Sequence, residues 1–365
     1  MAPRTIADIP TPALIVDIAG MERNIKRMAG FFAGSDCKLR PHFKAHKTPE
    51  IARRQLAAGS CTGLTCATVG EAEVAAGFCN DILIANQVVG RDKLARVAGL
   101  AKDGIDMKIA VDSVEGIEEV AEAAEEQGAE VGVLVDVNVG MPRCGVQPGE
   151  PVAALARRIS DTGGIRLRGV MGYEGHAVGI PERDKREAMA RSAMDRLTAS
   201  VEAIRGTGLP CEIVSAGGTG TFDITGRVPG ITEIQAGSYV LMDTAYAKLD
   251  MPFEHALWVL GTVVSRPSPG FCVLDSGHKS CTEDHGNPSV RDIEGAGVLF
   301  LSDEHASITL PADSALKVGD RVQLVPSHID PTINLHDVIY ALDGETVVEV
   351  WPITARGYSD QRADA

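Results

Sequence analysis

Short apolar runs rich in valine and isoleucine alternate with amphipathic segments over the first two thirds of the chain. The runs are predicted strands, and the segments between most of them are predicted helices. The clearest helical stripe places apolar side chains at three- and four-residue steps between residues 190 and 204. Eight predicted strands follow one another at 37–44, 63–69, 81–86, 106–111, 130–137, 165–172, 211–218 and 232–238. Alternating strands and helices predict a parallel sheet, and eight such strands can close a (β/α)8 barrel of the TIM type.

The pattern changes after about residue 250. The stretches 258–277, 295–310 and 319–331 are predicted to form strands separated by turns, with little helical periodicity. One further strand, at 13–18, precedes the eight and could belong to this second region. We therefore expect an α/β barrel domain at residues 20–250 and a smaller, mainly-β domain formed by residues 1–19 and 251–365.

Composition narrows the class of partner. The chain has 365 residues, a formal net charge of −15 and a pI near 5.1, which argues against nucleic acid or an anionic membrane as the main partner. No uncharged apolar run approaches the length of a membrane span, and no secretory signal is recognisable. The eight cysteines contain no CxxC pair. We expect a cytoplasmic protein with reduced thiols.

Distinctive residues fall where the predicted barrel strands end. Lys44 lies at the end of the first strand, within the basic stretch "RPHFKAHK", and Tyr173 follows the sixth strand. "NVGMPRCG" follows the fifth strand, and "SAGGTG" and "QAGS" end the seventh and eighth. Active sites of (β/α)8 barrels are built on the loops at this end of the strands. The sequence therefore predicts one site on this rim.

The two Gly-rich loops suggest a phosphate site. Barrel enzymes often bind phosphate after strands seven and eight, with backbone N–H groups that small residues leave accessible. An ordinary tight turn explains a single Gly cluster, but the pair at this position favours phosphate. The cradle would be formed by Gly218, Thr219, Gly237 and Ser238.

A lysine opposite a phosphate site suggests pyridoxal 5′-phosphate (PLP). The PLP aldehyde needs an amine that binds it covalently and later releases it to a substrate, and lysine is the side chain that does this. His42, His46 and Lys47 would supply cationic neighbours that activate Lys44. The alternative is that these basic side chains only pair with surplus acids on the rim.

Several longer motifs resemble one family. "RPHFKAHKTPEIARRQL", "MPRCGV", "SAGGTGTFD", "TEIQAGSYVLMD", "SDEH" and "VPSHIDPTINLHD" are similar to the metal-activated D-threonine aldolases. These belong with D-serine dehydratase and 3-hydroxy-D-aspartate aldolase in the alanine racemase-like fold group of PLP enzymes. The resemblance extends from about residue 10 to "VWPITARGYS" at 350–359.

The resemblance implies roles for individual residues. Lys44 corresponds to the catalytic lysine that binds PLP, Arg143 to an arginine near the phenolic oxygen, and Tyr173 to a residue beside the pyridine ring. The Gly-rich loops match the phosphate contacts. Gln235 stands where alanine racemases have an arginine facing the pyridine nitrogen. Because the tyrosine base of those racemases is also not found, racemisation is disfavoured.

"SHIDP" offers His328 and Asp330, alternate residues that a strand would point in the same direction. An isolated HxD pair is weak evidence, but the resemblance places this pair at the metal position of the family and gives His328 a catalytic role. One imidazole and one carboxylate suit Mn²⁺ best, with Mg²⁺, Zn²⁺ or Ca²⁺ as alternatives. Dehydratase relatives have cysteine in place of Asp330, so the carboxylate favours aldolase chemistry.

The expected activity is the retro-aldol cleavage of D-threonine and related 3-hydroxy-D-amino acids to glycine and an aldehyde. The alternatives are a 3-hydroxy-D-aspartate aldolase, a dehydratase of D-serine or 3-hydroxyaspartate, or a non-catalytic PLP carrier. A metal-bound hydroxide or a nearby histidine such as His336 could serve as base. Asp303, His305, His278 and His285 more readily fit structural roles. The resemblance also implies a homodimer.

Overall fold

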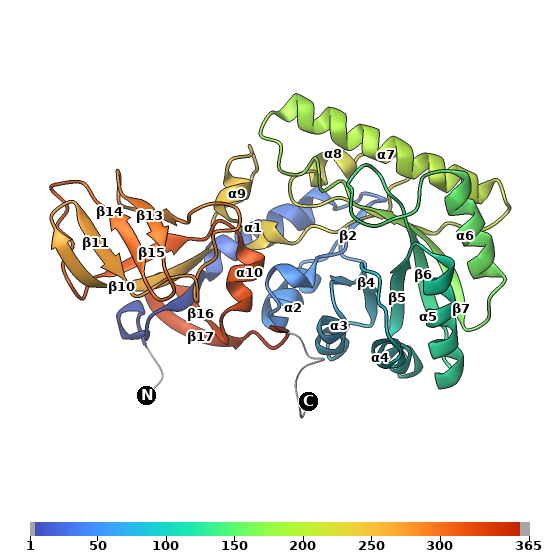
Figure 1. Cartoon of the computed structure of the whole chain (residues 1–365), viewed down its shortest axis with the longest axis horizontal. Coiled ribbons are helices and arrows are strands. Elements are labelled where there is room, and N and C mark those ends of the chain that lie inside the picture. The colour runs from blue at the N-terminus through green and yellow to red at the C-terminus, as the bar shows by residue number, and fades with distance from the viewer. Residues whose placement is uncertain (1–3, 358–365) are drawn as a thin grey trace. The chain divides into compact units, whose positions relative to one another are not determined.

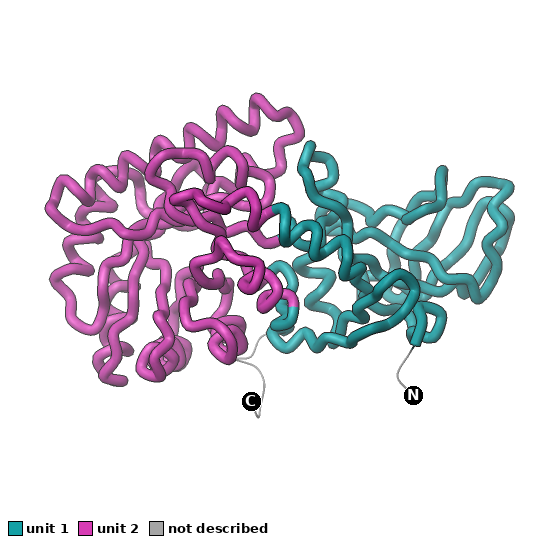
Figure 2. The backbone as a smooth tube through the Cα atoms, turned by 180° about the vertical axis from the view of Figure 1, so that it is seen from behind, with its two compact units in different colours: residues 1–27, 45–50, 238–357 teal, residues 28–44, 51–237, 358–365 magenta. Residues whose placement is uncertain are grey.

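The computed structural model describes residues 4–357, so the last two residues of the "VWPITARGYS" motif lie outside it. The chain forms two compact units, shown in different colours in Figure 2. We call residues 28–44 and 51–237 the barrel unit. Residues up to Arg27, 45–50 and 238–357 are the β unit.

The barrel unit contains the predicted eight parallel strands, in the order β2-β9-β8-β7-β6-β5-β4-β3. Two isolated parallel bridges, Leu39 to Cys61 and His42 to Thr65, connect β2 with the segment of β3, so the sheet curls round on itself. The fold class predicted from the alternating pattern is therefore confirmed. The strands are β2 (Lys38–Leu39), β3 (Leu64–Cys66), β4 (Asp81–Ile84), β5 (Asp106–Val111), β6 (Val131–Asp136), β7 (Ile165–Gly172), β8 (Ile213–Ala216) and β9 (Glu233–Ile234).

Helices follow most of these strands and pack against their neighbours on the outer side of the sheet (Figure 1). Their starts carry local signals: the Thr68 side chain accepts the N–H of Glu71 at the beginning of α3, and Ser113 does the same for Gly116 at the beginning of α5. The helices are α2 (Pro49–Ala57), α3 (Val69–Ala76), α4 (Arg91–Lys102), α5 (Val114–Gln127), α6 (Glu150–Ser160), α7 (Arg183–Arg205) and α8 (Phe222–Thr225).

The interior of the barrel is filled by side chains from successive strands. One buried layer takes a single apolar residue from each of the strands β4 to β8: Leu83, Ala110, Leu134, Met171 and Ile213. Because these parallel strands are covered on both faces, they have continuous apolar stretches rather than alternating ones. Gly169 in β7 has a φ of +151°, and a Cβ there would come within 1.9 Å of the Ile213 carbonyl oxygen. Only glycine fits this contact between β7 and β8.

Charged side chains form a paired network at the opposite end of the barrel from the predicted site. Arg40, which is 1% exposed, donates to Glu233 and Asp81, the first residues of β9 and β4. Lys108, also buried, donates to Asp81 at 2.9 Å and pairs with Asp106, the first residue of β5. Arg40 of the basic stretch is therefore a structural residue, held by acids from distant segments.

The β unit is built on a sheet in the order β13-β14-β11-β10-β1-β16-β17, with β15 pairing with β10 and β12. The strand predicted at 13–18 does join this sheet, because β1 pairs with β10 and β16. Trp258 and Trp351 are both buried in this unit. The strands are β1 (Ala13–Asp17), β10 (Leu257–Ser268), β11 (Phe271–Leu274), β12 (Ser289–Val290), β13 (Gly297–Leu301), β14 (Ala306–Thr309), β15 (Arg321–Val325), β16 (Val338–Asp343) and β17 (Thr346–Pro352).

Helices α9 (Thr244–Ala247) and α10 (Ile329–Asn334) and the 3-10 turns η1 (Ile6–Asp8) and η3 (Ser238–Val240) complete this unit, and α1 (Ile18–Phe31) begins in it and ends in the barrel unit. The eight cysteines, all within the described residues, form no disulfide. Between residues 4 and 357 no helix combines the length and the apolar character that a membrane crossing requires.

Candidate active site

The "RPHFKAHK" stretch differs from its predicted form. The regular strand β2 ends at Leu39, and Lys44 lies in a 3-10 turn, η2 (Phe43–Ala45), rather than at the end of a strand. Backbone hydrogen bonds from His42 N–H to the Ala236 carbonyl and from Thr65 N–H to the Pro41 carbonyl anchor the intervening residues. Lys44 is thereby half-buried on the side where the barrel strands end. The turn forms because the chain must leave the sheet before α2 begins.

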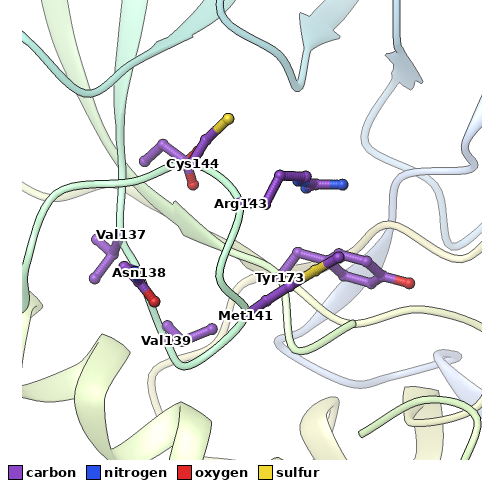
Figure 3. A pocket seen from close by; sticks show the side chains of 8 residues that line it. Val137, Asn138, Val139, Met141, Arg143, Cys144 and Tyr173 are labelled. Atoms are coloured by element: carbon purple, nitrogen blue, oxygen red, sulfur yellow. The ribbon is translucent and has the colours of Figure 1, made fainter. Parts of the chain in front are cut away.

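A pocket lies at the ends of β6 and β7 (Figure 3). The loop after β6 contributes Asn138, Met141 and Arg143, and Tyr173 follows the last residue of β7. The Arg143 guanidinium and the Tyr173 hydroxyl extend toward the same side, with the guanidinium carbon 5.7 Å from the centre of the Tyr173 ring. A cation and a phenol thus border one opening at the end of the barrel where (β/α)8 active sites occur.

Asp136, the last residue of β6, lines the same pocket and is 6% exposed. The pKa of its carboxyl is raised to about 6, mainly by burial and also by the nearby Asp112 carboxylate, although a hydrogen bond from Gln87 and the Arg143 charge act in the opposite direction. The Gln87 Nε2 atom donates to Asp136 at 2.8 Å. Sequence reasoning missed this residue, although an acid at the end of a buried strand is a usable signal.

The first Gly-rich loop follows β8 and is buried. Thr219 is 1% exposed, and a Cβ on Gly218 would come 3.3 Å from the Cε2 atom of the Tyr173 ring. A Cβ on Gly220 would come within 1.9 Å of the Val178 carbonyl oxygen, so this position also requires glycine. The loop therefore presents backbone rather than side chains beside Tyr173, as a phosphate cradle requires.

A buried carboxylate that sequence reasoning missed fixes the first Gly-rich loop by hydrogen bonds. Glu174 is fully buried and accepts the Gly217 N–H at 3.1 Å, the Thr221 hydroxyl at 2.7 Å and the Thr225 hydroxyl at 2.6 Å. The Thr221 hydroxyl oxygen in turn accepts the Gly218 N–H at 3.3 Å. Because three donors converge on one carboxylate, Glu174 fixes the path of the loop. The signal was available, since Glu174 directly follows Tyr173.

The second Gly-rich loop follows β9. The Gln235 side chain donates from Nε2 to the Ser215 hydroxyl at 2.7 Å, and Gly237 directly precedes η3, which begins at Ser238. A neutral amide therefore occupies this position, held by the neighbouring strand β8. Taken together, an amine, a guanidinium, a phenol and two glycine loops form a donor set that fits PLP.

The predicted metal pair does not lie on a strand. His328 is the N-cap residue of α10, and Asp330 lies in the first turn of that helix, since Pro331 and the preceding turn favour a helix start over an extended chain. The two side chains still converge, with His328 Nε2 3.8 Å from Asp330 Oδ1. This oxygen is buried and has no hydrogen-bond partner in the structure. An unpartnered buried carboxylate oxygen beside an imidazole nitrogen fits a divalent cation.

Asp243 anchors the main chain between the two residues of the pair. It accepts the Ile329 N–H at 3.3 Å and caps α9 by accepting the Tyr246 N–H at 2.9 Å. Burial raises the pKa of its carboxyl to about 6.

The structure shows the neighbours of the other histidines, whose roles the sequence left open. His285 stacks on His328 with ring centres 4.2 Å apart, and Asp284 lies 2.5 Å from His328 Nδ1. His336 Nε2 donates to the Ser280 carbonyl oxygen at 2.8 Å, so this ring holds the loop that contains Ser280.

The remaining candidates lie on the surface. Asp303 and His305 are exposed in the turn between β13 and β14. His278 lies 3.7 Å from Glu283.

Comparison with known proteins agrees with this geometry. Residues 16–245 match the family model "Alanine racemase, N-terminal domain", and residues 256–342 match "Putative serine dehydratase domain". A D-threonine aldolase from Arthrobacter sp. is 38% identical over 97% of this chain and 94% of its own length. A 3-hydroxy-D-aspartate aldolase from Paracoccus denitrificans (strain Pd 1222) is 33% identical, covering 96% and 93%.

Among solved structures, the D-threonine aldolase from Filomicrobium marinum superposes with a TM-score of 0.94 at 41% identity, covering 97% of each chain. The fold and site define an alanine racemase-like enzyme with a β domain. Within that class, the chain belongs to the D-threonine aldolase family, whose relatives include the 3-hydroxy-D-aspartate aldolases, and it is a lyase.

Proposed function

We propose that the protein is a PLP- and divalent-metal-dependent D-threonine aldolase that cleaves D-threonine and related 3-hydroxy-D-amino acids to glycine and an aldehyde. The observation that carries the aldolase assignment is the buried, unpartnered Asp330 oxygen 3.8 Å from His328 Nε2. A carboxylate beside an imidazole favours a hard or borderline ion such as Mn²⁺, whereas a thiolate would favour zinc. The similarity to D-threonine aldolases supports the same assignment.

The barrel residues would hold the cofactor. Lys44 would bind its aldehyde covalently, Arg143 would face its phenolic oxygen, and Tyr173 would lie beside its ring. The phosphate would bind to the backbone of the two glycine loops, with Gly218 and Thr219 in one and Gly237 and Ser238 in the other. Gln235 would face the pyridine nitrogen with a neutral amide. Bound PLP supplies an electron sink for the pair released when the Cα–Cβ bond breaks.

The pair at the start of α10 would hold the ion. His328 and Asp330 provide one nitrogen and one oxygen ligand and leave positions open for the substrate hydroxyl and water. A bound divalent ion supplies Lewis acidity, which lowers the pKa of the hydroxyl and can contribute several kcal/mol of charge stabilisation. In the net reaction the hydroxyl loses its proton, the Cα–Cβ bond breaks, and Cα gains a proton. His336 is bonded to Ser280, so its role is to position the loop rather than to act as base.

We further propose that residues 20–250 form the cofactor-binding domain and that residues 1–19 with 251–365 form the domain of the metal ligands. A homodimer is also proposed, and light scattering on the purified protein tests it.

Product analysis tests the activity. With D-threonine, PLP and Mn²⁺, we expect glycine and acetaldehyde in equal amounts, and none from L-threonine. Release of ammonia and a 2-oxo acid from D-serine or 3-hydroxyaspartate would instead establish a dehydratase, the second candidate, which the serine dehydratase domain match favours. Removal of metal with a chelator should abolish turnover but preserve the visible absorbance of lysine-bound PLP. A PLP carrier would show the absorbance and no turnover under any of these conditions.

A further inference from the structure

The loop between β11 and β12 brings two unassigned side chains to His328. Asp284 Oδ2 lies 2.5 Å from His328 Nδ1, and Asp284 Oδ1 accepts the Thr282 hydroxyl at 2.9 Å. The His285 ring is parallel to that of His328, with an interplanar angle of 8°. Asp284 and His285 are both exposed, and together with His328 they place three potential ligand atoms within 4.8 Å of one another.

The two nitrogens of His328 have different surroundings. Nδ1 faces the Asp284 carboxylate at hydrogen-bonding distance, whereas Nε2 faces the unpartnered Asp330 oxygen at 3.8 Å. A carboxylate accepts but does not donate, so the hydrogen of the neutral imidazole belongs on Nδ1. The lone pair is then on Nε2, the nitrogen that faces Asp330.

We propose that Asp284 is a positioning residue that holds His328 as the Nδ1–H tautomer and thereby makes Nε2 the ligand atom for the divalent ion. This inference rests on the proposed function, because it assumes that His328 binds a divalent ion. Ligating histidines commonly donate their second N–H to a carboxylate, which fixes the ring and increases the basicity of the ligand nitrogen. Asp284 provides that carboxylate from 44 residues away in the sequence.

The geometry excludes the alternative in which all three side chains bind the same ion. The lone pairs of an imidazole lie in the plane of its ring, and parallel rings 4.2 Å apart direct their lone pairs side by side. His285 and His328 therefore cannot converge on one ion in this arrangement. Asp284 Oδ2 lies 2.5 Å from His328 Nδ1, a distance typical of a charge-assisted hydrogen bond, which leaves no room for an ion between the two atoms.

The loop that carries Asp284 is fastened to the helix that carries Asp330. The Thr282 N–H donates to the Thr332 hydroxyl at 3.2 Å, and the Ser327 hydroxyl donates to the Thr282 carbonyl at 3.4 Å. His336 Nε2 donates to the Ser280 carbonyl at 2.8 Å. These protein contacts keep Asp284 in register with His328, as a preorganised outer residue requires.

The first experiment measures the tautomer directly in metal-free protein. Nitrogen-15 NMR of histidine-labelled protein distinguishes Nδ1–H from Nε2–H, and His328→Gln assigns the signal. We expect the wild type to show the Nδ1–H form, and Asp284→Ala to convert His328 to a mixture in which Nε2–H is prominent. Asp303→Ala, an exposed acid on another turn of the β unit, should leave the signal unchanged. An unaltered Nδ1–H signal in Asp284→Ala would overturn the proposal.

The second experiment measures Mn²⁺ affinity by titration calorimetry and by the loss of the free-ion EPR signal. We expect Asp284→Ala to bind Mn²⁺ about 10- to 100-fold more weakly than the wild type, the usual effect of removing an outer carboxylate. Asp284→Asn keeps an acceptor oxygen and should fall between the two. Asp330→Ala, which removes a ligand, should lose measurable binding. Equal affinity in Asp284→Ala and wild type contradicts the proposal, and so does a loss as complete as that of Asp330→Ala.

The two experiments separate this inference from the proposed function. If the wild type shows an Asp284-dependent Nδ1–H tautomer but binds no Mn²⁺, the metal-dependent aldolase assignment fails while Asp284 still fixes the ring. If the wild type binds Mn²⁺ and cleaves D-threonine but Asp284→Ala changes neither tautomer nor affinity, the assignment of function stands and the role of Asp284 is wrong.

Discussion

Arg40 and Lys44 lie four residues apart in the same basic stretch, but they belong to opposite ends of the barrel strands. The Arg40 guanidinium is buried and meets Glu233 and Asp81, where β9 and β4 begin. Lys44 lies half-buried in η2, on the side where the strands end. At the first end acids and bases are paired with one another. At the second, Arg143 and Tyr173 border a pocket, and Gly218 of the first glycine loop lies close to the Tyr173 ring.

Two aspartates show the same contrast. Asp106 begins β5, and although burial alone would raise its pKa, the Lys108 and Arg168 cations hold that pKa below its usual value. Asp136 ends β6 and has a pKa raised to about 6, mainly by burial. One carboxylate is stabilised as an anion and the other is not. The comparison teaches that the strand beginnings serve stability, while the strand ends keep groups in strained electrostatic settings that suit chemistry.

The largest expected effect comes from Lys44→Ala. Because no other amine replaces the covalent link to PLP, activity on D-threonine should fall by roughly a thousandfold or more. The visible absorbance of lysine-bound PLP should disappear after dialysis, and the free energy of unfolding without cofactor should change by less than about 0.5 kcal/mol. Spectrophotometry and urea unfolding measure both. Retained absorbance would contradict the assignment of Lys44.

Arg40→Met should show the reverse pattern, with a large loss of stability and an unchanged kcat. It leaves Glu233 buried without its partner, so the free energy of unfolding should fall by about 3–5 kcal/mol. The kcat of the folded fraction should remain that of the wild type, because Arg40 faces away from the strand ends.

The matched control for this change is Arg91→Met. Arg91 also pairs with an acid, Glu126, but the arginine side chain is 73% exposed. Its loss should cost less than about 1 kcal/mol in the same urea titration. Similar losses in the two variants would show that the buried network does not carry the stability we assign to it.

Asp136→Asn tests the end of the barrel where the strands end, through the pH dependence of the free energy of unfolding. The folded-state pKa of Asp136 is raised from 3.8 to about 6, so the protonated acid favours folding, and this contribution is lost as pH rises through 6. Between about pH 4 and pH 7 the wild type should lose roughly 3 kcal/mol of unfolding free energy relative to the variant. Urea unfolding at several pH values, without added cofactor, measures the difference.

Asp106→Asn serves as its counterpart, because the pKa of Asp106 is lowered. Its ionised form favours folding above the unfolded pKa, and that contribution is lost as pH falls. The variant should therefore be less stable than the wild type at neutral pH, with the gap closing in acid. Parallel pH profiles for the two variants would contradict the distinction between the two ends.

The smallest effect is expected for Glu174→Gln. Gly217, Thr221 and Thr225 all donate to this side chain, and the glutamine amide replaces one of its two acceptor oxygens with a donor, so at least one of these hydrogen bonds is lost. The free energy of unfolding should fall by about 1–3 kcal/mol. Because the loop it holds is the proposed phosphate cradle, PLP should bind about tenfold more weakly, equivalent to about 1.4 kcal/mol.

Glu182→Gln, at an exposed position before α7, is the control and should change neither quantity. Loss of stability in Glu174→Gln with unchanged PLP affinity would mean that Glu174 serves the fold alone.

The sequence by itself determined the architecture. The alternation of apolar strands and amphipathic helices is a local property, and it gave the count of eight barrel strands and the separate strand at 13–18. The position of the glycine loops after the last two barrel strands was equally readable. Long motifs indicated the family, which the comparisons confirmed over 97% of the chain.

Only the tertiary structure decided how the site residues are held. The sequence placed Lys44 on a strand and the His328–Asp330 pair on another, whereas the chain forms a 3-10 turn and a helix start there. It gave no sign that Asp284 would meet His328 or that Glu233 would neutralise Arg40. Such partners come from segments tens to hundreds of residues apart, and burial and pKa depend on what surrounds a group in space. The hydrophobic periodicity of a sequence indicates on which face of a helix or strand a residue lies, but not which residue it contacts in the folded protein.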